Sequence, residues 1–177
     1  MSSRPSRFVS RAFLRHLVFD AMIVIGGTVL TVIVLDYRHR TAQAELALDA
    51  TRSAVRLMQA SVDLHTVIER GSLEYVAYPQ MIETLWFDDA VPTNHLLLGD
   101  RPWVELAADD ELELRHPRIP TADGGAHAMF WYNPALGVVR ARVPRTLSDA
   151  EALELYNEVN GTRLQELTAL AGSDERE

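Results

Sequence analysis

The fold is decided by residues 17–70, which read LVFDAMIVIGGTVLTVIVL from 17 to 35 and DYRHRTAQAELALDATRSAVRLMQASVDLHTVIER from 36 to 70. From Thr28 to Arg70 the stretch holds no Gly and no Pro, the two residues that fit a helix interior least well. Gly71 follows directly and is a typical residue at the end of a helix. We therefore expect one continuous helix over residues 17–70, about 80 Å long at 1.5 Å per residue.

The first part of this helix has the composition of a membrane span. Leu17 to Leu35 would measure about 28 Å as a helix, close to the hydrocarbon thickness of a bilayer. Its one charge, Asp20, lies a turn from the N-terminal edge, where it can pair or reach the interface. Gly26 and Gly27 lie near the centre. The sequence therefore predicts a transmembrane helix over residues 17–36.

Arginine flanks this segment unevenly. Four arginines precede it and two follow it closely: Arg4, Arg7, Arg11 and Arg15 before, Arg38 and Arg40 after. Basic residues stay on the cytoplasmic side, so we expect a single-pass protein of the bacterial inner membrane with residues 41–177 outside. A cleaved signal peptide is the alternative, since residues 42–44 imitate a cleavage site. The apolar core is too long for one, which favours an uncleaved anchor.

Charge and composition limit the partners. The chain has 17 basic residues, all of them Arg, 25 acidic residues and no Cys. Most of the acidic residues follow residue 40, so the outer part is strongly negative and unsuited to nucleic acid. Without Cys the chain can form neither disulfides nor thiolate metal sites. We expect the membrane as one partner and no nucleic acid.

The second part of the helix is amphipathic in an unusual way. One narrow polar stripe repeats at intervals of three and four: Glu45, Asp49, Arg52, Arg56, Gln59 and Asp63. Nearly all other positions are apolar or small, which is about twice the apolar arc of an ordinary surface helix. Two surfaces must cover it, either both within its own domain or one of them on another subunit. The predicted interaction face consists of Leu46, Val55, Leu57, Met58, Val62 and Leu64.

Short strands and turns follow the helix. Strands are predicted over 74–78, 103–107 and 111–115, a helical stretch over 80–86, and loops over 88–102 and 117–125. The clearest signal is a hairpin over 126–143, whose turn contains Gly137. Alternation in its second strand places Val139, Ala141 and Val143 in the core, with Arg140 and Arg142 facing outward.

The C-terminal part begins with a capping box. Ser148 and Glu151 have the required spacing, so residues 149–159 should be helical and end at Gly161. A second short helix could follow over 162–170. Asn160-Gly161-Thr162 matches a glycosylation sequon, but the helix end explains it as well.

The expected fold is α+β, with a single N-terminal transmembrane helix that continues into a long amphipathic helix. That helix packs on a small antiparallel β-sheet, and one or two short helices follow it. The parts are a basic cytoplasmic N-terminus (1–16), the transmembrane helix (17–36), the amphipathic helix (37–70), the β domain (71–147), the C-terminal helices (148–171) and a disordered tail (172–177).

The sequence offers little chemistry. Its six His are scattered without metal-ligand spacing, and the acidic run 109–113 lacks the alternating ligands and Gly of a calcium loop. We therefore predict no catalytic residue, no metal and no cofactor. Aromatic residues of the hairpin could form a ligand platform, although alternate ones should fill the core. The residues of such a surface or pocket would be Trp103, Phe130, Tyr132, Arg140 and Arg142.

The layout resembles the type IV pilins and type II secretion pseudopilins. Their plan is a short basic N-terminus, an apolar helix continuing into an amphipathic one, and an antiparallel sheet. The resemblance implies anchoring in the inner membrane and packing of helices in an assembly. Asp20 would take the place of the family's Glu, whereas Arg15 stands where the family's leader ends in Gly. The cleavage motif of the prepilin peptidase is thus not matched.

Three functions from different classes follow. The first is a non-enzymatic membrane-anchored assembly subunit, pilin-like in form, in homo- or hetero-oligomers with other membrane-anchored helical subunits. The second is a bitopic coiled-coil scaffold of the cell envelope, similar in layout to cell-division proteins. The third is an extracytoplasmic ligand-binding or sensor domain.

Overall fold

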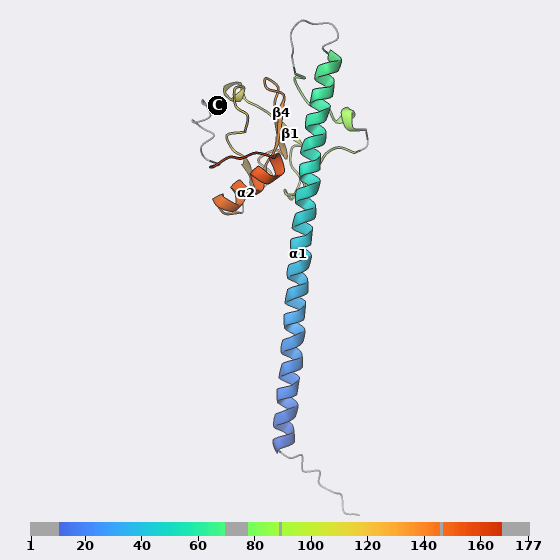
Figure 1. Cartoon of the computed structure of the whole chain (residues 1–177), viewed down its shortest axis with the longest axis vertical. Helices are drawn as coiled ribbons and strands as arrows, with labels where there is room; N and C mark the ends of the chain where they lie inside the picture. Colours follow the sequence, from blue (N-terminus) through green and yellow to red (C-terminus); the bar gives the residue numbers. More distant parts are fainter. Residues whose placement is uncertain (1–10, 70–77, 89, 146, 168–177) are drawn as a thin grey trace, which may run out of the picture. The chain divides into compact units, whose positions relative to one another are not determined.

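Figure 1 shows the computed structural model of the chain, which describes residues 11–69, 78–88, 90–145 and 147–167. Within its long helix, the side chains of residues 11–21 and 23–25 lie outside the description. The chain divides into two compact units, Met1–Gln43 and Ala44–Glu177. Each unit is described by itself below.

One helix, α1, covers Arg11–Glu69 and so supplies residues to both units. The predicted helix over 17–70 is confirmed as far as the structure describes it, and it begins six residues earlier. The residues between 11 and 17 contain no Gly or Pro that would delay its start.

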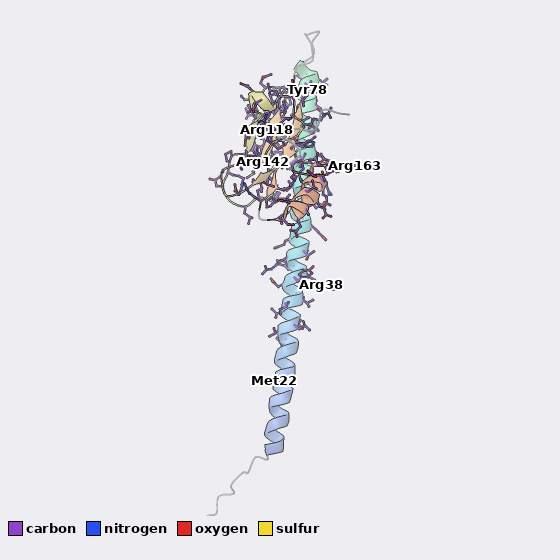
Figure 2. The ribbon with its side chains drawn as sticks, turned by 90° about the vertical axis from the view of Figure 1, so that its left-hand side faces the viewer. Met22, Arg38, Tyr78, Arg118, Arg142 and Arg163 are labelled. Atoms are coloured by element: carbon purple, nitrogen blue, oxygen red, sulfur yellow. The ribbon has the colours of Figure 1, made fainter. Side chains whose placement is uncertain are left out.

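Several described side chains of the first unit bond to near neighbours on the same helix. Thr31 donates to the Gly27 carbonyl over 2.9 Å, and Arg40 pairs with Asp36 at 2.8 Å. The large apolar side chains are exposed on all sides of the helix (Figure 2): Met22, Val29, Leu30, Val32, Ile33, Val34 and Leu35.

Among the side chains that the structure describes, no helix is both long and apolar enough to cross a membrane. This finding does not cover the side chains of residues 17–21 and 23–25, which belong to the predicted transmembrane segment but lie outside the description.

The second unit is built around a three-stranded sheet. Its strands are β1 (Val104–Leu106), β3 (Phe130–Asn133) and β4 (Val138–Ala141), in the order β1-β3-β4. The β3–β4 pair is the predicted hairpin, with Phe130 opposite Ala141 and Asn133 opposite Val138. A small second sheet joins β2 (Thr121–Ala122) to β5 (Val143–Pro144).

The expectation of an antiparallel sheet is wrong in part, because the sheet is mixed. β1 pairs with β3 in parallel, with Val104 beside Phe130 and Leu106 beside Tyr132. A parallel pair needs a long connection, and residues 107–129 supply it. This segment contains the 3₁₀ helix η3 (Asp109–Glu111) where a strand over 111–115 was predicted. Glu111 stabilises that turn by accepting a hydrogen bond from the Ala108 amide.

Other local predictions differ in extent. The helical stretch over 80–86 is only a 3₁₀ helix, η2, at Thr84–Phe87. The predicted strand over 74–78 lies outside the described residues except for Tyr78, which is not in a strand. The loop over 88–102 is confirmed where described, and its side chains Asn94 and Leu97 are buried in the interior.

The second helix, α2, spans Asp149–Asn160 and confirms the capping box. The Glu151 amide donates to the Ser148 hydroxyl, and Gly161 ends the helix with a φ of 65°. Residues 162–167 are not helical, contrary to prediction. The Asn157 side chain explains this, because it exchanges two hydrogen bonds with the Leu164 backbone and holds the segment extended. The rest of that predicted helix and the tail over 172–177 lie outside the described residues.

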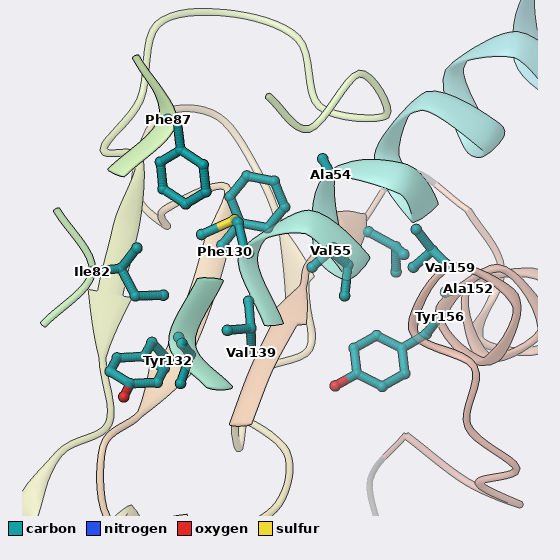
Figure 3. Close-up of a cluster of buried hydrophobic side chains, with 14 residues drawn as sticks. Ala54, Val55, Ile82, Phe87, Phe130, Tyr132, Val139, Ala152, Tyr156 and Val159 are labelled. Carbon is teal, nitrogen blue, oxygen red and sulfur yellow. The ribbon is translucent and has the colours of Figure 1, made fainter. Parts of the chain in front are cut away.

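The core of this unit forms where residues 44–69 of α1 pack on the sheet and on α2 (Figure 3). Both helices and the hairpin contribute fully or almost fully buried side chains to it. They include Met58, Val62, Phe130, Tyr132, Val139, Tyr156 and Val159. The long helix is therefore an integral part of the domain.

Candidate functional site

The predicted interaction face of the long helix divides into two faces. Val55, Met58 and Val62 are 7%, 0% and 0% exposed, because they pack against the sheet of their own domain. Leu46, Leu57 and Leu64 are 69%, 49% and 57% exposed. Half of the predicted face is thus buried within the domain, and the other half is exposed.

Buried polar groups fix the inner face in its register on the domain. Thr51 is buried and accepts a hydrogen bond from the His95 amide over 2.9 Å. The Gln59 side chain donates to the Gly137 carbonyl over 2.7 Å and accepts from the Val139 amide over 3.1 Å. Gln59 therefore satisfies backbone groups of β4 that a neighbouring strand would otherwise pair.

One charged residue of the polar stripe, Arg52, also reaches the domain. Arg52 binds Asp49 on its own helix and Glu158 on α2, at 3.0 Å and 2.8 Å. Its Nε also donates to the Glu158 carbonyl. Arg52 thus joins the two helices at the margin of the core.

The outer face of α1 within this unit remains uncovered. Its large side chains Leu46, Leu57, Leu64, Val67 and Ile68 are all exposed. Single exposed apolar residues are ordinary on protein surfaces, whereas a row along one helix face is typical of surfaces that take part in binding. This row is the candidate functional site of the chain.

The predicted pocket residues do not form a pocket. Phe130 and Tyr132 are completely buried, and the Tyr132 hydroxyl donates to the Pro79 carbonyl over 2.6 Å. Trp103 donates to the Pro92 carbonyl and meets Phe87 edge to face at 5.8 Å. The interpretation of these aromatic residues as core is confirmed, and the ligand platform is not formed.

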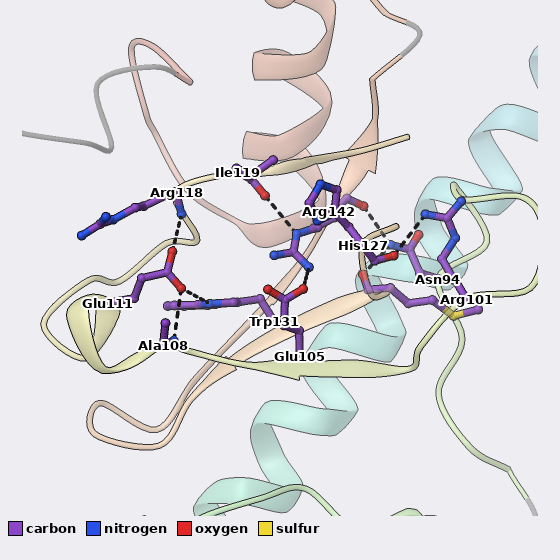
Figure 4. A network of polar contacts seen from close by, with 11 residues as sticks. Asn94, Arg101, Glu105, Ala108, Glu111, Arg118, Ile119, His127, Trp131 and Arg142 are labelled. Atoms are coloured by element: carbon purple, nitrogen blue, oxygen red, sulfur yellow. Dashed lines mark hydrogen bonds and ion pairs between the residues drawn. The ribbon is translucent and has the colours of Figure 1, made fainter. Parts of the chain in front are cut away.

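Arg142 contradicts the alternation that placed it on the surface. Its side chain is 3% exposed, and it binds the Glu105 carboxylate at 2.7 Å and the Ile119 carbonyl at 2.9 Å (Figure 4). Burial raises the pKa of Glu105, but the hydrogen bond and charge of Arg142 outweigh it and hold that pKa below the ordinary value. Arg142, which directly follows β4, is thus bound to β1 through Glu105 and to the crossover between β1 and β3 through Ile119.

Arg140 is half-buried rather than outward-facing. Its Nε donates to His116 Nδ1 over 3.3 Å, and the Tyr156 hydroxyl lies 3.1 Å from the same nitrogen. Burial lowers the pKa of Arg140 and raises the pKa of Tyr156, so the tyrosine stays neutral across the physiological range. The cluster joins the outer side of the hairpin to α2.

Three asparagines hold the loops through contacts that the sequence did not predict, although Asn160 was noted as part of the sequon and the helix end. Asn133 donates to the carbonyls of Glu111, Leu112 and Leu114, and Asn94 donates to those of Met129 and Arg142. Asn160 exchanges two hydrogen bonds with the Ala141 backbone. No sequence signal indicates these contacts, because each asparagine side chain bonds a segment that is distant along the chain. The Asn160 amide is engaged inside the fold, so the helix end explains the sequon.

The surface of the described part of the second unit has cavities, among them one beside α2 and one beside Leu97. The larger, about 570 Å³, lies between α2 and the strand β2, and is bordered by Arg118, Ile119, Arg145, Leu153 and Leu167. The smaller, about 490 Å³, lies beside Leu97 and Arg101. None of the five predicted pocket residues borders either cavity. Among the residues described, no group of three His, Asp or Glu could hold a metal ion.

The predicted anchor residues are described only in part. Gly26, Gly27 and Leu35 are exposed on α1, whereas the side chains of Leu17 and Asp20 lie outside the description. The chain matches no family model, no curated protein and no solved structure. Its function is therefore argued from its own residues.

Proposed function

We propose that this chain is a non-enzymatic, membrane-anchored assembly or scaffold subunit of the bacterial cell envelope, pilin-like in form. It associates with other subunits through the outer face of α1. The observation that carries the proposal is the exposed row of Leu46, Leu57 and Leu64 on a helix whose opposite face is already buried.

The cost of leaving this row in water supports a partner. Burying apolar surface is worth about 25 cal/mol per Å², so covering one exposed leucine gains about 1–2 kcal/mol. Five large apolar side chains lie on this face, and the gain adds up along it. Association through a preformed helix also avoids the entropy of ordering a flexible segment.

The proposed anchor is the apolar segment 17–36. Its described side chains from Val29 to Leu35 are exposed around the helix, and a helix that is apolar on every side is buried in a protein or a membrane. The four arginines that precede it favour a cytoplasmic N-terminus. The acidic domain is then outside the cytoplasm.

The contacts of the polar side chains support a structural role for the domain. Asn94, Asn133 and Arg142 are the kind of buried polar groups that often serve binding or catalysis, yet each holds a loop by bonding its backbone. Their arrangement stabilises a small platform behind the helix. This platform fixes which face of α1 stays available.

A triple variant tests the proposal. Leu46→Gln, Leu57→Gln and Leu64→Gln together keep helix propensity but remove the apolar row. In detergent extracts of membranes, we expect the wild-type chain to co-purify in an assembly and the variant to sediment as a monomer. Unfolding of both by urea serves as the folding control. A monomeric wild-type chain in extracted membranes would contradict helix-mediated assembly.

Anchoring and processing need separate measurements. Alkaline carbonate extraction should leave the wild-type chain in the membrane pellet, and its release into the supernatant would contradict the anchor. Mass spectrometry of the membrane-bound chain should show Met1 intact, since Arg15 does not match the peptidase motif. A mass that begins at residue 16 would instead indicate pilin-type processing.

A further inference from the structure

The outer face of α1 carries a regular spacing within the second unit. Seven exposed, uncharged residues follow one another at alternating intervals of four and three: Leu46, Ala50, Ser53, Leu57, Ala60, Leu64 and Val67. We name these residues the outer seam. Their mean spacing of 3.5 residues is the repeat of a helix that packs along another helix.

The domain leaves the outer seam free to meet a partner. The buried row of the same helix is Thr51, Val55, Met58, Val62 and Thr66. At 100° per residue, the two rows point in directions about 170° apart. A second helix can therefore lie along the outer seam without displacing the domain from the inner row.

We propose that the outer seam binds the outer seam of a second copy of this chain, in parallel and in register. This inference rests on the proposed function, because anchors in one membrane hold both helices in the same direction and at high effective concentration. The pair is formed by the extracytoplasmic part of α1.

The residues of the seam are suited to pairing with themselves. In a parallel pair in register, each seam residue meets its own copy, so leucine layers at 57 and 64 alternate with small layers at 53 and 60. The small residues allow the helices to approach closely, and the leucines fill the space between those layers. Each layer is uncharged.

The charges beside the seam select the direction. On one flank lie Asp49, Arg56 and Asp63, and on the other Ala47, Ala54, Ser61 and Ile68, none of them charged. In a parallel pair each charged flank faces the uncharged flank of the other copy. An antiparallel pair over the whole seam would set Asp49 near Asp63 of the second copy and Arg56 near its own copy. Like charges thus disfavour the antiparallel pair.

The length of the seam makes the pair dependent on the membrane. Residues 46–67 extend about 32 Å along the helix. A stable interface in solution buries about 1,200–2,000 Å² in total, which is more than three heptads of small and medium side chains provide. The membrane anchors compensate for this small interface by holding two copies close together.

Disulfide cross-linking of the full chain in membranes tests this pairing. The chain contains no Cys, so each substitution introduces a unique thiol. Under mild oxidation, Leu57→Cys and Leu64→Cys should each give a product of twice the chain mass. Asp63→Cys is the matched control, because it is equally accessible but lies off the seam, and it should give little product.

A mixed experiment distinguishes the two directions. Leu46→Cys and Leu64→Cys chains that carry tags of different length are expressed together. A parallel pair should give no disulfide-linked product that contains one chain of each kind. Such a mixed product would overturn the parallel arrangement. Links from Leu57→Cys to a different protein overturn pairing with a second copy but support the proposed assembly function. Equal yields of cross-linked dimer from Asp63→Cys and Leu64→Cys would overturn the assignment of the outer seam as the contact surface. Recovery of the chain outside the membrane overturns the proposed function.

Discussion

Gly137 and Gly161 have almost the same backbone conformation in different surroundings. Their φ angles are 63° and 65°, in the left-handed region where a side chain costs about 1–2 kcal/mol. A Cβ at Gly161 would meet nothing within 4 Å, whereas a Cβ at Gly137 would overlap the ring of Tyr78. The hairpin turn therefore requires glycine for two reasons, its left-handed backbone and the space that the Tyr78 ring occupies.

We predict that Gly137→Ala destabilises the domain more than Gly161→Ala does. Gly161→Ala should lower the free energy of unfolding by the conformational cost alone, about 1 kcal/mol. Gly137→Ala adds an overlap with the Tyr78 ring, which brings its loss to about 3 kcal/mol. Urea denaturation followed by tryptophan fluorescence measures both. Equal losses would mean that Tyr78 moves aside freely.

The Glu105–Arg142 pair makes the stability of the domain depend on pH. The folded pKa of Glu105 lies below its ordinary value of 4.5. A carboxylate with a depressed pKa contributes stability above the unfolded value, and this contribution is lost as pH falls through the folded one.

We therefore predict that Glu105→Gln lowers the free energy of unfolding by about 1 kcal/mol at pH 7, because it leaves the buried guanidinium without its counter-charge. The difference from the wild type should shrink as pH falls below about 4.5. Denaturation at a series of pH values measures it. The control is Glu113→Gln, because Glu113 is an exposed residue of the crossover between β1 and β3. A difference that stays constant down to pH 3 would contradict the pairing.

At the scale of elements, the hairpin and α2 follow from local sequence. The hairpin depends on β-prone residues around a turn with glycine, and α2 on its capping box and final glycine, so neighbours in sequence fix both. The parallel pairing of β1 with β3 depends on a connection whose path no local pattern gives. The segment 162–167 was missed for a similar reason, since Asn157 holds it by its side chain.

Adjacent residues of α1 provide a test of its two faces. Met58→Ala should cost about 2–4 kcal/mol, because it opens a cavity between the helix and the sheet. Leu57→Ala should cost less than about 1 kcal/mol, because the side chain is half exposed. Thermal unfolding of the two variants gives the comparison. Similar losses would show that the inner and outer faces are assigned wrongly.

At the scale of the whole molecule, the boundary between the two units falls within α1. The second unit begins at Ala44 and includes the helix residues that fill its core. A boundary at the end of the helix, as the sequence suggested with a β domain starting at residue 71, would separate Val55, Met58 and Val62 from the sheet that covers them.

We predict that a fragment covering residues 44–177 unfolds cooperatively and that a fragment covering 71–177 does not. The shorter fragment loses the helix side of its core and exposes Phe130, Tyr132 and Val139. Circular dichroism during thermal unfolding distinguishes the two. A sharp transition of the shorter fragment would contradict the assignment of α1 to the core.

The sequence by itself determined the elements whose cause is local, namely the long helix, the hairpin and the capped second helix. It also indicated that the helix has too much apolar surface for one partner. Only the tertiary structure decided which residues the domain covers, because burial depends on what lies opposite. For the same reason Arg142 is buried despite an alternation that pointed it outward. Val55 and Leu57 are both apolar residues of one helix, and only the packed domain separates the core residue from the exposed one.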